Sequence, residues 1–155
     1  MVDLAVRGAS NISVVCDDTD VFVLLIHFYC REKLNCGVTM ESPIAGRCVI
    51  DIKATANKHS NITDYLPGVH ALSGCDTTSF IFGVGKATAL KALSSGMCLE
   101  LLGVEDVNMD DIVFEATSFI SMCYMVQSMM ETCQRCAMLS GRQKWPTQKY
   151  PVLQS

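Results

Sequence analysis

The 155-residue sequence has few charged residues and no excess of basic ones. Charged side chains make up 18% of the chain and hydrophobic ones 50%, so we expect most of its length to fold, with enough residues for one domain. The net charge of −4 counts against a typical nucleic-acid-binding protein, which carries a basic excess. It still allows a local basic patch beside an acidic metal site.

Signals for secretion or membrane insertion are also missing from the sequence. The first residues, MVDLAVRGAS, hold no basic region followed by a long apolar core, so we expect no secretory signal. The longest apolar run, Val21 to Cys30, is about half of what a membrane span needs, and no membrane contact is expected. The nine cysteines are odd in number and lie mostly in apolar runs, which is typical of free thiols in a reducing, intracellular compartment.

The order of apolar segments predicts an α/β fold with a helical C-terminal part. A β-branched run, Asn11 to Cys16, predicts a buried strand, and a helix is expected from about Thr19 to Leu34, ended by Gly37. Short strands are expected in VTM and RCVIDI. Short helices are expected in DIKATANKHS, in NITDYLPGVHALSG with an interruption near Pro67-Gly68, in KATALKALSS and in CLELLG, followed by a long apolar helix from about Asp110.

Three acids directly follow the first predicted strand. Asp17, Asp18 and Asp20 lie between that strand and the next helix, and open α/β sheets bind ligands at the carboxyl ends of their strands. Neighbouring carboxylates repel one another unless a positive charge lies between them, and hard cations such as Mg²⁺ prefer oxygen ligands. The alternative is helix capping, which explains one or two of the three acids.

A single acid, Asp76, precedes a glycine-rich turn in the segment ALSGCDTTSFIFGVGKATALKAL. Taken alone, an Asp in this setting is typical of a cap or a turn. The following Gly83-Val84-Gly85-Lys86 opens a predicted helix and resembles turns whose backbone N–H groups face a phosphate. Here Gly83 and Gly85 permit the turn and Lys86 adds charge. The P-loop spacing is absent, and an ordinary loop is the alternative.

The long C-terminal helix carries cysteine and methionine patterns with two interpretations each. Cys133 and Cys136 form a C-x-x-C pair, and as i and i+3 residues of a helix they fit two core positions. A zinc site would need two further ligands at a suitable spacing, which the sequence does not offer nearby. A redox site would need a thioredoxin-like strand–helix context, which is also missing. Its methionines fit either core packing or an adaptable partner-binding face. No Ser-His-Asp or Cys-His arrangement is evident in the sequence.

Two stretches, VVCDDTDVFVLL and LSGCDTTSFIFGVGKATALKAL, together resemble the flap endonuclease/XPG superfamily, a branch of the PIN-like nucleases. The first resembles a motif in which a strand ends in D-x-D. The second resembles G-[CS]-D-Y followed by the glycine hairpin of a helix–two-turn–helix element, with Thr77 in place of the aromatic. The sequence of the two stretches is also similar to that of large animal proteins with a divergent nuclease-like domain, some of which look transposon-derived. The resemblance covers roughly Ala5 to Leu102.

The resemblance implies roles for six residues, all in metal-dependent phosphodiester hydrolysis. Asp18, Asp20 and Asp76 match metal ligands of the family and would bind Mg²⁺ or Mn²⁺. The hairpin residues Gly83, Gly85 and Lys86 match positions that hold a DNA backbone phosphate. The implied partner is flap or single-stranded DNA, and the implied location is the nucleus.

The family's other acidic motifs precede the matching region, so the resemblance implies the C-terminal half of a nuclease-like domain. Such a chain is expected to be inactive or weakly active by itself, because a two-metal mechanism needs more ligands. We expect a partial PIN-like core over 1–102 with the glycine hairpin at 74–93, a helical extension over 103–139 and a flexible tail over 140–155. The alternative function is a non-catalytic protein- or nucleic-acid-interaction module, or a remnant of a transposon-derived protein, whose Met-rich helix (Ile112 to Leu139) contacts a protein partner.

Overall fold

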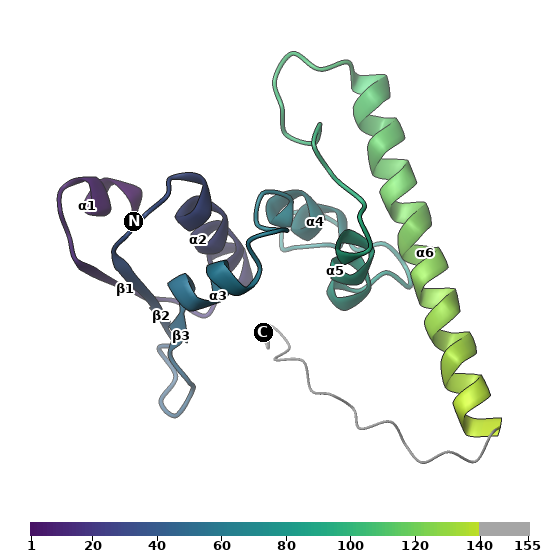
Figure 1. Ribbon diagram of the computed structural model, residues 1–155, viewed down its shortest axis with the longest axis horizontal. Helices are drawn as coiled ribbons and strands as arrows, with labels where there is room; N and C mark the ends of the chain where they lie inside the picture. Colours follow the sequence, from purple (N-terminus) through teal and green to yellow (C-terminus); the bar gives the residue numbers. More distant parts are fainter. Residues whose placement is uncertain (140–155) are drawn as a thin grey trace. The chain divides into compact units, whose positions relative to one another are not determined.

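The computed structural model describes residues 1–139, with side chains described as far as Thr132. In this part the chain has a mixed α/β fold of helices α1 (Val2–Val6) to α6 and three strands, as the order of apolar segments predicted (Figure 1). The finer assignment to a PIN-like fold stays a prediction. The chain divides into two compact units, Met1–Pro67 and a second unit that begins at Gly68. The tail expected over 140–155 lies outside the described residues.

The first unit is built on a small mixed sheet. Its strands are β1 (Asn11–Val15), β2 (Gly37–Glu41) and β3 (Ile50–Asp51), in the order β1-β2-β3. β1 and β2 are parallel, while β2 and β3 are antiparallel. Parallel strands need a crossover connection, and helix α2 (Thr19–Arg31) provides it. The result is a βαβ unit in which β1 leads directly into α2.

The core of the first unit lies between the sheet and two helices. α2 packs against α3 (Ile52–Lys58), and α3 packs against β2. Tyr29 of α2 is buried and its hydroxyl donates a hydrogen bond to the carbonyl oxygen of Cys36 at 3.1 Å. Burial is the main cause that raises the pKa of the Tyr29 phenol above its ordinary value. The other large buried side chains of this unit are Ile12, Phe22, Val23, Leu25, Ile26, Val38, Met40, Ile52 and Ile62.

The sequence placed the end of α2 three residues too late. The helix ends at Arg31 because Lys33 adopts a left-handed conformation, with φ of 49°. The N–H of Leu34 then bonds the carbonyl of Tyr29, and the N–H of Lys33 bonds that of Cys30, which together form a Schellman motif. Glycine usually takes the left-handed position of this motif, so Gly37 was the expected stop. Gly37 instead opens β2, where a Cβ atom would clash with the side chain of Asn11.

Three other expected elements differ in the structure. The strand expected in RCVIDI shrinks to β3, because Asp51 accepts the N–H of Ala54 at 2.9 Å and starts α3. The helix expected over NITDYLPGVHALSG forms only in part: residues 61–65 are turns, and α4 (Leu66–Leu72) begins next to the expected interruption and includes Pro67 and Gly68. A proline in the first turn of a helix lacks only an N–H that has no helical partner there. The helix expected in CLELLG does not form, because the Glu115 carboxylate takes the N–H groups of Glu100 and Leu101.

The second unit is centred on the packing of α5 (Lys86–Ser94) against α6 (Met109–Leu139), which lie side by side in Figure 1. The shared core contains Ala89, Ala92 and Leu93 from α5, with Phe119 and Cys123 from α6, all buried. Burial raises the pKa of the Cys123 thiol, which keeps this cysteine protonated and unreactive. The start of α6 matches the predicted start near Asp110, whose N–H bonds the side chain of Asn108.

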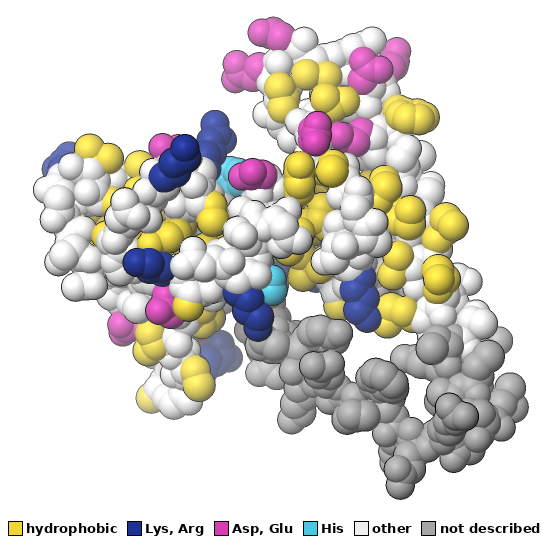
Figure 2. Space-filling model, in the orientation of Figure 1, with side chains coloured by type: hydrophobic (Ala, Val, Ile, Leu, Met, Phe, Trp, Pro, Cys, Tyr) yellow, Lys and Arg dark blue, Asp and Glu magenta, His cyan; other side chains and the backbone are white. Residues whose placement is uncertain are grey.

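The outer face of α6 is apolar. Figure 2 shows hydrophobic side chains gathered along this helix, and Phe114 and Met129 are 75% and 71% exposed. Within the described residues, the segment Met109–Thr132 is the one helix long and apolar enough to cross a membrane by length and composition, with a mean hydropathy of 1.2. Core helices of soluble proteins also meet these two criteria.

Candidate functional site

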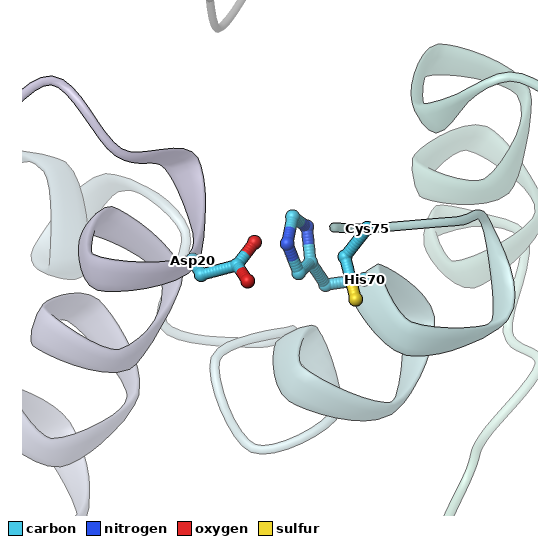
Figure 3. Close-up of side chains that lie close together, drawn as sticks. All are labelled: Asp20, His70 and Cys75. Atoms are coloured by element: carbon cyan, nitrogen blue, oxygen red, sulfur yellow. The ribbon is translucent and has the colours of Figure 1, made fainter. Parts of the chain in front are cut away.

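The three acids of the first unit lie where the sequence predicted them. Asp17 and Asp18 follow the carboxyl end of β1, and Asp20 lies in the first turn of α2 (Figure 3). The N–H of Cys16 bonds the carbonyl oxygen of Glu41 at 2.9 Å, so the parallel ladder continues up to the residue before the acids. The acidic segment therefore begins at the edge of an α/β sheet where ligands usually bind.

Asp17 and Asp18 each have a partner within the first unit. The Asp18 carboxylate accepts the N–H of Asp20 at 2.8 Å through Oδ1 and is the N-cap of α2. Asp17 forms an ion pair with Arg47 at 3.2 Å, from the loop between β2 and β3. Helix capping thus accounts for Asp18, as the alternative interpretation held, and Arg47 supplies a positive charge beside Asp17 that the sequence did not reveal.

The donor set of the first unit fits a hard cation. Asp18 is exposed and its cap bond uses one carboxylate oxygen, which leaves Oδ2 for a ligand. Asp20 is half-buried and offers a second carboxylate. Carboxylate oxygens are preferred by Mg²⁺ and Mn²⁺. Asp17, engaged by Arg47, is the weakest candidate of the three, and the family resemblance also assigns it no ligand role.

Asp76 belongs to the second unit and lies in a tight turn after α4. The turn closes through two backbone hydrogen bonds of 3.2 Å between Cys75 and Thr78, and Asp76 is exposed within it. Gly74 enters the turn with φ of +95°, and a Cβ atom there would come within 2.6 Å of Phe80. Only glycine fits this position, because both the conformation and the close approach exclude a side chain.

The turn brings a histidine and a cysteine together in the second unit. The ring of His70, from α4, and the thiol of Cys75 have potential metal-ligand atoms within 4.8 Å of each other (Figure 3). His70 is buried, while Cys75 is half-buried. The two residues are a possible pair of metal ligands, although sulfur and imidazole nitrogen suit Zn²⁺ better than the Mg²⁺ or Mn²⁺ expected from the sequence.

The surroundings of Cys75 favour its thiolate. The pKa of the Cys75 thiol is lowered from its ordinary value, first by the side-chain hydroxyl of Thr77 and then by that of Thr78. These hydroxyl oxygens lie 3.3 and 3.2 Å from the sulfur. Thr78 also bonds the carbonyl oxygen of Ala71 at 2.8 Å, which occupies its only hydroxyl proton. Thr77 is therefore the side chain that can donate to the thiolate.

The glycine hairpin forms as expected and leads into α5. Gly83 has φ of +79°, a conformation that favours glycine, and the N–H of Val84 bonds the carbonyl oxygen of Ile81 at 3.0 Å. Gly85 is the N-cap of α5 and gives the helix no side-chain cap. Lys86 is the first helical residue and is half-buried. The N-terminus of α5 thus presents backbone N–H groups beside a lysine.

Gly85 has an unusual freedom for a glycine in a tight segment. Its φ of −87° is accessible to any residue, and a Cβ atom built on it would meet nothing within 4 Å. Neither conformation nor packing within the described chain demands glycine there. Glycine is a tolerated N-cap residue, and it also leaves the first N–H groups of α5 open to approach by an anion.

Several residues near these positions escaped the sequence interpretation. The proximity of His70 and Cys75 depends on the turn at Gly74, and the role of Arg47 depends on a loop from the other end of the sheet. The only local signal was the short spacing between a histidine and a cysteine, which is common by chance. Tyr124 of α6, whose hydroxyl donates a hydrogen bond to the carbonyl oxygen of Phe82, has no local sequence signal at all.

No protein-family model matches the chain, and no match was found among curated proteins or solved structures. The nuclease-like interpretation rests on the two sequence motifs and on the positions that their residues take.

Proposed function

We propose that this chain is a divergent nuclease-like domain that binds a divalent cation and a nucleic-acid backbone but cleaves weakly or not at all by itself. In this proposal Asp18, Asp20 and Asp76 supply carboxylates to Mg²⁺ or Mn²⁺. The hairpin Gly83–Lys86 binds a phosphate of flap or single-stranded DNA. The proposed location is the nucleus, by the family resemblance.

The observation that carries the proposal is the position of the acids of the first unit. They lie between the carboxyl end of β1, a strand paired in parallel with β2, and the N-terminus of α2. Charge at this position is what metal-dependent α/β enzymes use to place a cation against a phosphate. Capping uses only one oxygen of Asp18, so the cap and a bound cation are compatible.

The hairpin supports the phosphate-binding part of the proposal. The first turn of a helix of nine residues carries unpaired N–H groups and a partial positive charge, which attract anions. Lys86 adds a full positive charge next to them. The missing side chain at Gly85 leaves the space through which a phosphate oxygen would reach these groups.

Each residue has a defined task in the proposed chemistry. The carboxylates hold the cation, which when bound would stabilise negative charge on phosphate oxygens and acidify a water molecule. The hairpin orients the backbone phosphate. Weak activity is expected, because three carboxylates are too few to hold two ions in the geometry of an efficient two-metal site.

Calorimetric titration with Mn²⁺ tests the metal-binding part. The sharpest variant is Asp18→Asn, because asparagine is as good an N-cap as aspartate and keeps the bond to the N–H of Asp20 while removing the charge. We expect Mn²⁺ binding by the wild-type chain and a marked loss in Asp18→Asn and in Asp76→Asn. Unchanged binding in both variants would sink the assignment of these ligands.

A matched control removes one acid elsewhere. Asp106 is exposed and has φ of 64°, a left-handed conformation that asparagine also adopts readily. Asp106→Asn therefore changes the net charge by the same amount with little strain, and it should bind Mn²⁺ as the wild type does. A similar loss in this control would mean that overall charge, and not ligation, explains the effect.

Cleavage assays test the catalytic part. With Mn²⁺, the wild-type chain is expected to cut flap and single-stranded DNA weakly or not at all. Efficient metal-dependent cleavage that Asp76→Ala abolishes would show that the chain is a competent nuclease and would overturn the expectation of weak activity.

A non-catalytic interaction module is the second candidate function, and the exposed face of α6 favours it. Val113, Phe114, Met125 and Met129 are 55%, 75%, 60% and 71% exposed on one helix. Monomeric proteins usually expose apolar residues singly, whereas these residues gather on one helix. Methionine side chains also adapt to partners of different shapes. Sedimentation of the wild type beside Met125→Glu/Met129→Glu tests whether this face joins two copies of the chain.

A further inference from the structure

The turn after α4 holds two side chains in a fixed relation that the proposed function does not use. α4 ends at Leu72, and the left-handed Gly74 sends the chain back so that Cys75 lies beside His70 of the same helix. Because Phe80 lies against Gly74, no other residue fits the bend. The proximity of the thiol and the imidazole is thus imposed by the backbone.

Hydrogen bonds hold the thiol in place. The two backbone bonds between Cys75 and Thr78 close the turn, and the Thr78 hydroxyl ties it to the carbonyl oxygen of Ala71 in α4. A third bond runs from the N–H of Cys75 to the Thr78 hydroxyl oxygen at 3.2 Å. The sulfur is therefore positioned relative to α4 before any ligand binds, which lowers the entropy that binding costs.

The distance between the two groups suits one metal ion. Zn–S and Zn–N bonds of about 2.3 and 2.0–2.1 Å at a tetrahedral angle place sulfur and nitrogen about 3.6 Å apart. The Cys75 sulfur and a His70 ring nitrogen lie within 4.8 Å of each other. Side-chain rotations that move the two atoms about 1 Å closer together would bring them to the separation that a zinc ion requires.

The chemistry of the pair selects the metal. A thiolate and an imidazole are ligands for Zn²⁺ and related borderline-soft ions, whereas Mg²⁺ requires oxygen. The Thr77 hydroxyl, 3.3 Å from the sulfur, supplies the outer hydrogen bond that commonly orients a metal ligand. With two protein ligands, the remaining positions of a tetrahedral ion are open to water or to another ligand, in contrast to the closed four-ligand sites of structural zinc.

We propose that His70 and Cys75 form an open binding site for Zn²⁺ in the second unit. The inference does not depend on the proposed function, because neither His70 nor Cys75 has a role in that function; Asp76, although it is next to Cys75 in the turn, is not one of the two ligands proposed here. A chain that fails to bind Mn²⁺ at Asp18 can still bind Zn²⁺ here, and the reverse also holds.

Cobalt titration of the full chain tests the proposal, because Co²⁺ bound to a thiolate gives a near-ultraviolet charge-transfer band. The experiment uses reduced, metal-free protein in a Cys133→Ser/Cys136→Ser background, which removes the C-x-x-C pair as a competing site. We expect a saturable band that Zn²⁺ abolishes and Mg²⁺ leaves unchanged. Cys75→Ser and His70→Asn should each lose the band.

The control is Cys98→Ser, since Cys98 is an exposed cysteine of the same unit and should not contribute. The proposal is overturned if the band persists in Cys75→Ser, if a folded parent chain shows no band, or if Mg²⁺ displaces the cobalt. Because His70 is buried, circular dichroism must show that His70→Asn is folded. Mapping of iodoacetamide alkylation needs no variant: Zn²⁺ should protect Cys75, and absence of protection also overturns the proposal.

Discussion

The hydroxyl of Tyr124 donates a hydrogen bond of 2.8 Å to the carbonyl oxygen of Phe82. Tyr124 lies midway along α6, and Phe82 is the residue before the glycine hairpin. The side chain of Gln127, one turn further along α6, lies 3.7 Å from the position of a Cβ atom on Gly83. The long apolar helix thus holds the hairpin in place, besides packing against α5.

Removal of this hydroxyl should loosen the hairpin. Tyr124→Phe keeps the ring and loses one hydrogen bond, with an expected decrease in the free energy of unfolding of about 0.5–1.5 kcal/mol, at the lower end because the site is exposed. Hydrogen exchange should become faster at Val84 and its neighbours. Ser121→Ala, which removes only a bond within α6, should leave hairpin exchange unchanged; equal acceleration in both would mean that α6 itself is loosened.

A substitution at the N-cap of α5 should change the stability of the chain and its binding of phosphate in opposite directions. Gly85→Ser adds a side chain that caps the helix, so the free energy of unfolding should rise by a few tenths of a kcal/mol. The same hydroxyl occupies the N–H groups proposed to bind phosphate, so affinity for single-stranded DNA should fall roughly two- to fivefold, which corresponds to ~0.4–1 kcal/mol. Chemical denaturation measures the free energy of unfolding, and fluorescence anisotropy measures the affinity for single-stranded DNA. Unchanged affinity in the more stable variant would argue against phosphate binding at α5.

The charge at the hairpin should affect the salt dependence of DNA binding. Lys86→Gln removes one cation beside the N-terminus of α5, so the slope of log affinity against log salt should decrease by about 1. Lys53→Gln removes an equal charge from an exposed position on α3 and is the control. If both variants reduce the slope equally, the contact with DNA is not localised at the hairpin.

The packing of α5 against α6 should dominate the stability of the second unit. Phe119 is only 1% exposed, and Phe119→Ala is expected to lower the free energy of unfolding by about 3–5 kcal/mol, because it removes buried surface and leaves a cavity. Phe114→Ala on the exposed face of the same helix should change it by about 0.5 kcal/mol or less. Chemical denaturation compares them, with Phe119→Leu as a milder variant if Phe119→Ala does not fold. Comparable losses at both positions would contradict the assigned core.

The Thr77 hydroxyl should control the reactivity of Cys75. The hydrogen bond from Thr77 is the first cause of the lowered pKa of this thiol, so Thr77→Val should raise the pKa and shift the pH profile of alkylation to higher pH. In metal-free protein at mildly alkaline pH, Cys75 should react more slowly in the variant. Mass spectrometry of the alkylated peptides distinguishes Cys75 from Cys98. The rate of alkylation at Cys98 should be the same in the wild type and in Thr77→Val. An unchanged profile at Cys75 would show that Thr77 does not stabilise the thiolate.

Local sequence signals predicted the elements that carry the proposed function. A β-branched run before Asp17 indicated β1, the acids indicated the start of α2, and the glycines before Lys86 indicated the start of α5. Each signal depends on residues that are close in the chain: β-branched side chains favour strands, aspartate caps a helix, and glycine adopts a left-handed turn. The sequence by itself therefore determined the α/β class and the order of these elements.

Only the tertiary structure decided which side chains meet. The Glu115 carboxylate reaches back to the N–H groups of Glu100 and Leu101 and prevents the helix that their sequence favours. Arg47 neutralises Asp17 from another loop, and Tyr124 holds the segment before the hairpin. These contacts join residues far apart in the chain, and their partners are chosen by the packing of whole helices and strands. Periodicity and spacing carry no record of that packing, because they report only on neighbours along the chain.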